Sequence, residues 1–155
     1  PAQHFTGRGL TDRFHTLWAS WAIRDPASGK KAWFGGDTGY RTVHAGENED
    51  DVPVCPEFKK IGEKFGGFDL AFIPIGAYRT REMMSSIHCA PQDSVRVFKD
   101  IQAKRAIGMH CVSRTWALTT EPVMEPPQRL REECEKLGIP KDAFDICALG
   151  ETVFA

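Results

Sequence analysis

The chain has 155 residues, of which 41% are hydrophobic and 26% are charged, and its formal net charge is −1. These values are typical of one soluble globular domain and argue against a disordered chain or a coiled coil. A chain so close to neutral lacks the basic surface that binding to nucleic acid requires. No apolar run approaches the ~20 residues that span a bilayer. The sequence opens on Pro-Ala-Gln-His without an initiator Met, and we therefore expect it to be part of a longer protein.

The first half of the chain predicts a β-hairpin followed by a helix. The side chains of residues 16–23 alternate with a period of two, which is typical of a β-strand. A turn that contains Pro26 and Gly29 then leads to a second strand at 32–34. That strand ends at the sequence Gly-Gly-Asp-Thr-Gly. Residues 56–65 have the spacing of an amphipathic helix, with Pro56 suited to its first turn and Gly66 to its end.

The second half predicts strands that alternate with helices. Residues 70–77 form a continuous apolar run, typical of a strand covered on both faces, although Pro74 implies a bend or an end there. Pro91 opens a second helix, and residues 106–109 form a short apolar strand.

The remaining residues predict one more helix and a closing hairpin. Pro127 opens the helix, which ends at Gly138, and residues 144–154 turn at Gly150. The whole order predicts an α/β fold in which a mixed sheet packs against one helical layer. The other face of that sheet needs a cover that this chain has few residues left to supply.

Five cysteines, at 55, 89, 111, 134 and 147, follow no C-x-x-C pattern. The odd count and irregular spacing argue against a disulfide framework or a four-cysteine zinc site. We predict reduced thiols, several of them buried, in a reducing intracellular compartment.

Four residues stand at positions where α/β proteins assemble sites, namely strand ends and the loops that follow them. Asp37 follows the second strand between glycines, and His110 directly follows the strand at 106–109. His88 lies just before a helix, and His4 precedes the first hairpin. A purely structural alternative for Asp37 is an Asx-turn, which Asp-Thr-Gly forms readily.

Imidazoles and a carboxylate are the ligands of catalytic zinc sites, and a carboxylate can bridge two metals. His4, Asp37 and His110 carry that chemistry. They are too few for two metals, because each metal needs at least three protein ligands, and their long-range spacing is not specific by itself.

Four segments together resemble the metallo-β-lactamase superfamily, most closely its N-acylphosphatidylethanolamine-hydrolysing phospholipase D branch. They read P-A-Q-H-F at 1–5, F-G-G-D-T-G-Y at 34–40, F-G-G-F-D-L-A-F-I-P-I-G-A-Y at 65–78 and H-C-A-P-Q-D-S-V at 88–95. The resemblance extends over nearly all 155 residues.

The resemblance implies a hydrolase of αβ/βα architecture with two zinc ions. It implies that His4, Asp37 and His110 are metal ligands, that Asp37 bridges the two metals, and that Asp37 and His110 are catalytic. It implies that His88 contacts the substrate.

This sequence departs from the pattern of the family in two places. The family's H-x-H-x-D-H signature is absent, so residues 1–155 correspond to the C-terminal half of the domain, without its N-terminal half. The stretch after His110 is about two residues longer than usual, which affects substrate choice.

The implied reaction is zinc-dependent cleavage of N-acylphosphatidylethanolamine to an N-acylethanolamine and phosphatidic acid. Two alternatives stay open: a superfamily hydrolase of a soluble ester, lactone or phosphodiester, and a non-catalytic half-domain that binds a partner. The predicted partners are a phospholipid, a membrane surface and the N-terminal half, on the same polypeptide or a second chain; a homodimer stays open. The predicted location is intracellular, peripheral on an internal or mitochondrial membrane, and the 155 residues alone are expected to be inactive.

Overall fold

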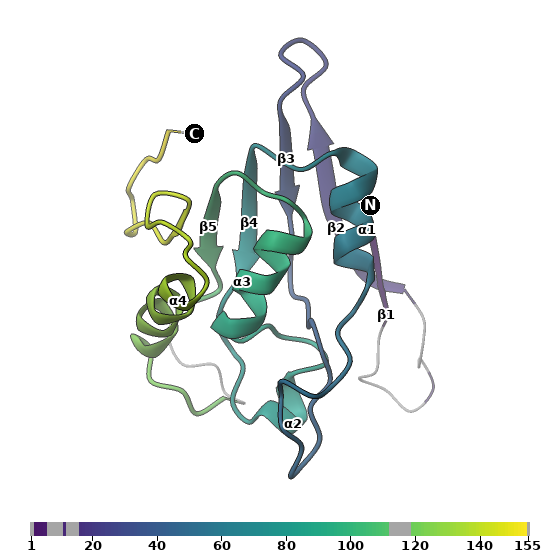
Figure 1. The fold of residues 1–155 in the computed structure, drawn as a ribbon, viewed down its shortest axis with the longest axis vertical. Helices are drawn as coiled ribbons and strands as arrows, with labels where there is room; N and C mark the ends of the chain where they lie inside the picture. Colours follow the sequence, from purple (N-terminus) through teal and green to yellow (C-terminus); the bar gives the residue numbers. More distant parts are fainter. Residues whose placement is uncertain (1, 6–10, 12–15, 112–118, 155) are drawn as a thin grey trace.

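The computed structural model describes residues 2–5, 11, 16–111 and 119–154 (Figure 1). Its strands are β1 (Ala2–Phe5), β2 (Thr16–Arg24), β3 (Lys31–Phe34), β4 (Leu70–Pro74), β5 (Ala106–Met109) and β6 (Phe144–Asp145). Its helices are α1 (Glu57–Phe65), α2 (Arg81–Met84), α3 (Pro91–Asp100) and α4 (Glu125–Lys136).

The six strands of the described chain form one sheet in the order of the sequence, β1 to β6. The pairs β1–β2 and β2–β3 are antiparallel, whereas β3, β4, β5 and β6 run parallel to one another. The mixed sheet that the sequence predicted is therefore confirmed. Because β3, β4 and β5 point the same way, the loops that follow them, and α2 with them, gather at one edge of the sheet (Figure 1).

The long helices α1, α3 and α4 lie together on one face of the sheet (Figure 1), which confirms the single helical layer. Trp33 of β3 faces this layer: it is buried, and its ring meets Phe58 of α1 edge to face at a centroid distance of 6.2 Å. On β4, Ala71 and Ile73 are likewise fully buried. The core of the molecule lies between these strands and the helices.

The opposite face of the sheet is apolar and open in the described chain. Trp21, Ile23 and Phe34 are 51%, 57% and 42% exposed. Trp21 pairs with Phe34, and Phe34 pairs with Phe72 of β4, so these side chains form a row across three strands. Within the apolar run at 70–77, only Leu70 and Phe72 are partly exposed in the described chain, whereas residues 73–77 are all buried.

Prolines and glycines set the ends of the elements much as the sequence predicted. Pro56 immediately precedes α1, and Gly66 ends it with a φ of +63°, a left-handed conformation that costs glycine little. Pro91 is the first residue of α3. Pro74 ends β4 rather than bending it.

The C-terminal prediction is wrong. The predicted hairpin at 144–154 does not form: β6 covers only Phe144–Asp145 and pairs in parallel with β5. Residues 148–151 make a turn in which Glu151 N donates to Ala148 O, and no strand follows it within 152–154. Strand β6 pairs instead with β5, which is distant in sequence, and a local sequence pattern cannot reveal such a pairing.

Smaller differences concern short elements. Helix α4 begins at Glu125, so that two prolines occupy its first turn, where a missing N–H costs nothing. Strand β1 and the one-turn helix α2 were not predicted, because four residues carry too little periodicity to be recognised. Within the described residues, no helix combines the length and the apolar character needed to cross a bilayer.

Candidate metal centre

Three of the predicted site residues meet at the edge of the sheet where the parallel strands end. Asp37 lies in the loop after β3, His110 directly follows β5, and His88 lies in the turn between α2 and α3. One donor atom from each side chain can be chosen such that all three atoms lie within 4.8 Å of one another. Residues far apart in the sequence thus form one cluster, which we call the Asp37–His88–His110 cluster.

The cluster is compact and partly shielded from water. His110 Nε2 lies 3.2 Å from Asp37 Oδ1, and the imidazole of His88 stacks on that of His110 at a centroid distance of 5.1 Å. His88 is only 8% exposed, whereas the side chain of Asp37 is 35% exposed. The carboxylate is therefore the most exposed group of the cluster.

Unusual backbone conformations position these side chains. His110 has a φ of +65°, and Ala77, in the loop after β4, has a φ of +63°. Few residues other than glycine adopt this left-handed conformation, and they cluster at functional sites. Gly36, next to Asp37, also has a φ of +63°, so a glycine suits this position.

His4 reaches the same edge through its backbone. It lies in β1, which pairs with the beginning of β2: Gln3 opposes Ala19, and Ala2 opposes Ser20. That part of β2 extends past the end of β3, beside the Asp37 loop. The side chain of His4 lies outside the described part of the structure, so its predicted role as a ligand stays a prediction.

Two imidazoles and a carboxylate match the nitrogen and oxygen donors that zinc takes in hydrolytic enzymes. The three donors of the cluster are sufficient for one metal and insufficient for two. The cluster therefore fits part of a metal centre, and additional ligands are needed for a second ion.

A cavity of about 240 Å³ opens beside His110. Its lining includes Gly76 and Ala77 after β4 and residues 119–123 ahead of α4, so it combines backbone, hydroxyl and apolar groups. It provides space for a substrate group next to the cluster. The segment after His110 that is longer than usual, residues 112–118, lies outside the described residues.

Glutamates ahead of and within α4 hold the wall of this cavity. Glu121 accepts hydrogen bonds from the backbone N–H groups of Tyr78 and Arg79 at 2.9 and 3.1 Å. Glu125 accepts one from the Tyr78 hydroxyl at 2.6 Å and pairs with the Arg79 guanidinium at 2.8 Å. Burial, together with the Glu125 carboxylate, raises the pKa of Tyr78, so the phenol is a hydrogen-bond donor at neutral pH.

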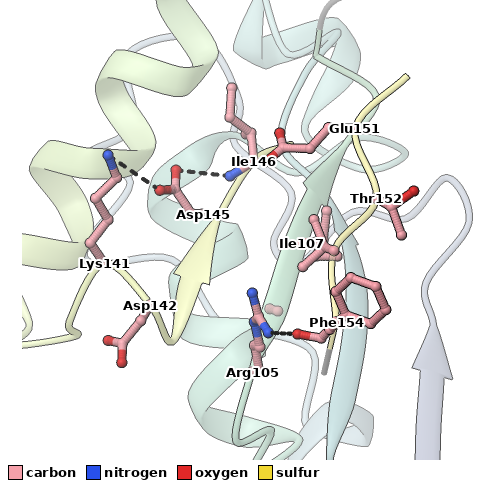
Figure 2. A pocket seen from close by; sticks show the side chains of 11 residues that line it. Arg105, Ile107, Lys141, Asp142, Asp145, Ile146, Glu151, Thr152 and Phe154 are labelled. Atoms are coloured by element: carbon pink, nitrogen blue, oxygen red, sulfur yellow. Dashed lines mark hydrogen bonds and ion pairs between the residues drawn. The ribbon is translucent and has the colours of Figure 1, made fainter. Parts of the chain in front are cut away.

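A larger cavity, of about 590 Å³, lies at the opposite edge of the sheet (Figure 2). Three of its charged side chains bind other residues of the lining: Lys141 lies 3.6 Å from Asp145, and Arg105 donates to the carbonyl of Phe154. Among the described residues that line it, none is a histidine. Despite its size, this cavity does not carry the chemistry of the Asp37–His88–His110 cluster.

Sequence reasoning missed the charged residues that hold the loops next to the cluster segments in place. Asp93 is fully buried between Arg41 and Arg81, and Glu121 anchors the loop after β4. Asp93 does lie within the resembling segment at 88–95, but an acid in the first turn of a helix is ordinary.

Residues 1–111 match the family model described as the beta-lactamase superfamily domain. The chain is 43% identical over 132 residues to "N-acyl-phosphatidylethanolamine-hydrolyzing phospholipase D 1" of Caenorhabditis elegans, covering 85% of this chain and 33% of the relative. It is 32% identical over 153 residues to "N-acyl-phosphatidylethanolamine-hydrolyzing phospholipase D, mitochondrial" of Saccharomyces cerevisiae, covering 98% and 29%. The chain thus spans about a third of the length of these curated relatives.

Among solved structures, unliganded yeast PDE1 superimposes on the chain with a TM-score of 0.60. The superposition covers 95% of this chain and 42% of the yeast protein, at 12% sequence identity. At that identity the likeness concerns the fold alone.

Proposed function

Because the chain belongs to the metallo-β-lactamase superfamily, we propose that it forms part of a zinc-dependent phosphodiester hydrolase. The proposed reaction is phospholipase D-type cleavage of N-acylphosphatidylethanolamine: water adds to phosphorus, and the P–O bond to the N-acylethanolamine breaks, which leaves phosphatidic acid. The observation that carries the proposal is the Asp37–His88–His110 cluster, with donor atoms within 4.8 Å, at the edge of the sheet where β3 and β5 end.

The names of the two relatives support the choice of substrate. Both are called N-acyl-phosphatidylethanolamine-hydrolysing phospholipases D, and their identity with this chain extends over most of its length. The cavity beside His110, with both polar and apolar walls, is compatible with an amphiphilic substrate. The word "mitochondrial" in the yeast name supports a location at an internal membrane.

Each residue of the cluster has a proposed role. Asp37 and His110, 3.2 Å apart, hold the metal, and His4 joins them from β1. His88 donates a hydrogen bond to the phosphate or to the N-acyl group of the substrate. Its place within the cluster also makes His88 a candidate metal ligand, and the metal content of a His88 variant separates the two roles. Zinc, when bound, supplies an activated water at neutral pH and positive charge opposite the phosphoryl oxygens.

The complete hydrolase needs more than these residues. Three donors do not suffice for two metals, and Trp21, Ile23 and Phe34 leave an apolar sheet face open. We propose that an N-terminal half, on the same polypeptide or on a second chain, covers this face and contributes the remaining ligands. An exposed apolar surface of this kind marks an interface.

The test uses the complete protein with N-acylphosphatidylethanolamine in mixed micelles. We expect release of N-acylethanolamine and phosphatidic acid in equal amounts, loss of this activity with a chelator, and recovery with added zinc. A soluble phosphodiester and a lactone serve as comparison substrates. Faster turnover of either would replace the lipid substrate, and no metal-dependent turnover of any of them would favour a non-catalytic partner-binding domain.

A further inference from the structure

Asp93 is a fully buried carboxylate that lies outside the cluster, in the first turn of α3. Its Oδ1 lies 2.8 Å from Arg41 Nε, and its Oδ2 accepts a hydrogen bond from Arg81 Nη2 at 2.6 Å. The side chain of Arg41 is itself only 2% exposed. One carboxylate thus joins two guanidinium groups in the interior of the protein.

The two arginines belong to the two segments that carry Asp37 and His88. Arg41 directly follows the Asp37 loop, and Arg81 opens α2, whose end leads into the turn with His88. Asp93 itself stands just after that turn. The Asp93 carboxylate therefore connects the end of the Asp37 loop to residues on both sides of the His88 turn. We call Asp93, Arg41 and Arg81 together the buried bridge.

These segments also touch directly. A Cβ on Gly39 would stand 2.4 Å from the backbone oxygen of Ser85, so only a glycine allows this approach. The backbone N–H of Val43 donates to Ser85 Oγ at 2.9 Å. A change in the position of one segment must consequently move the other.

Glu49 forms an outer layer around the bridge. It pairs with Arg81 at 2.8 Å and accepts a hydrogen bond from Gln92 at 2.9 Å, while its backbone carbonyl accepts one from Arg41. Both arginines are thus held by Glu49 as well as by Asp93, and charge-assisted contacts of this kind orient a side chain.

Burying an ion triad is an inefficient way to gain stability, because the cost of desolvation cancels much of the attraction between the charges. Such a network does impose a defined geometry. The geometry points to Asp93 as a positioning residue, which sets the distance between Asp37 and His88 through Arg41 and Arg81. This inference rests on the proposed function, because a metal or phosphate bound at the cluster is what needs that distance.

The test compares Asp93→Asn with Phe98→Leu in the complete protein. Phe98 lies on the same helix but packs against Phe144, with a centroid distance of 5.3 Å, so its loss weakens α3 without touching the bridge. We expect Asp93→Asn to weaken Co²⁺ binding by about tenfold or more and to change the visible spectrum of the cobalt form. Phe98→Leu should retain the Co²⁺ affinity and the visible spectrum of the wild-type protein, even where its melting temperature falls as far as that of Asp93→Asn. Equal metal affinities and spectra in the two variants would overturn the inference.

A second pair of variants covers the case in which Asp93→Asn does not fold. Arg81→Lys keeps the charge opposite Asp93, and Arg81→Gln removes it. We expect Arg81→Lys to retain most of the metal affinity that Arg81→Gln loses. The same loss in both would contradict the positioning role.

Hydrogen exchange separates this inference from the proposed function. In the metal-free protein, the amides of Val43 and His88, bonded to Ser85 Oγ and Met84 O, should exchange faster in Asp93→Asn or Arg81→Gln than in Phe98→Leu. If the wild-type protein binds no metal, the proposed function is rejected. The comparison of exchange rates still tests whether the buried bridge holds the two segments in place. Unchanged protection of both amides in Asp93→Asn and Arg81→Gln would overturn the inference that Asp93 positions these segments.

Discussion

Gly76 lies directly against the backbone of His110: a Cβ built on Gly76 would stand 1.9 Å from the His110 carbonyl oxygen. The contact joins the end of β4 to the end of β5, where Ile75 N donates to Met109 O at 3.0 Å. His110 has its left-handed conformation at this point. The absence of a side chain at residue 76 thus helps to define where the imidazole of His110 stands.

Gly76→Ala is therefore expected to displace His110. The added methyl group meets backbone rather than a flexible side chain, so the end of β5 has to shift. In the complete protein we expect metal affinity to fall by about tenfold or more, as measured by zinc titration. Gly138→Ala is the control: it strains a position of positive φ, at a cost of about 1 kcal/mol, but its methyl group meets open space after the end of α4. Equal metal affinity in the two variants would show that the contact does not position His110.

Asp37→Asn is expected to reduce the rate of phosphodiester hydrolysis by several orders of magnitude. The amide keeps the shape of the side chain but loses the negative charge that a bound metal requires. Steady-state kinetics with metal analysis measures both effects. Asp25→Asn, in the exposed turn between β2 and β3, removes a carboxylate elsewhere and should leave turnover near the wild-type value. Near-normal activity of Asp37→Asn would remove this residue from the proposed site.

His88→Asn separates contact with the substrate from binding of metal. If His88 contacts the phosphate, activity falls while the zinc content of the complete protein stays near the wild-type value. His44→Asn, at an exposed position, should change neither. Loss of zinc together with activity would instead make His88 a ligand, in agreement with its place among the three clustered donors.

The 155 residues produced alone are expected to self-associate through the open face of the sheet. Trp21, Ile23 and Phe34 are large, apolar and exposed, and contacts between such faces remove them from water. Light scattering should show aggregates that diminish in Trp21→Lys, whereas Met83→Lys, at an exposed position on α2, should have little effect. Metal analysis should show weak zinc binding. A stable monomer that holds two zinc ions tightly would contradict this prediction and the need for an N-terminal half.

Much of the fold was predictable because its signals are local. The end of β4 at Pro74 and the end of α1 at Gly66 follow from the backbone chemistry of single residues. Asp37 and His110 were recognisable as candidates because each directly follows a strand, and parallel strands bring their ends together. The resemblance of the sequence to a known family added roles to these positions.

Other features depend on pairings that no local pattern contains. Phe144–Asp145 joins β5 in parallel instead of forming a hairpin, because the exposed edge of β5 supplies backbone partners that are distant in sequence. The stacking of His88 on His110 likewise arises only once α2 and α3 place the turn between them over the end of the sheet.

The buried bridge shows most clearly what could not be predicted from the sequence alone. In the sequence, Asp93 is an acid in the first turn of a helix, where it needs no special explanation. Only the folded chain brings Arg41 and Arg81 to its two oxygens and removes all three side chains from most of the solvent. The sequence by itself determined which residues carry metal-binding chemistry and which strands present them. The tertiary structure decided how the segments that hold them are locked together, because ion pairs inside a protein depend on distances that exist only after folding.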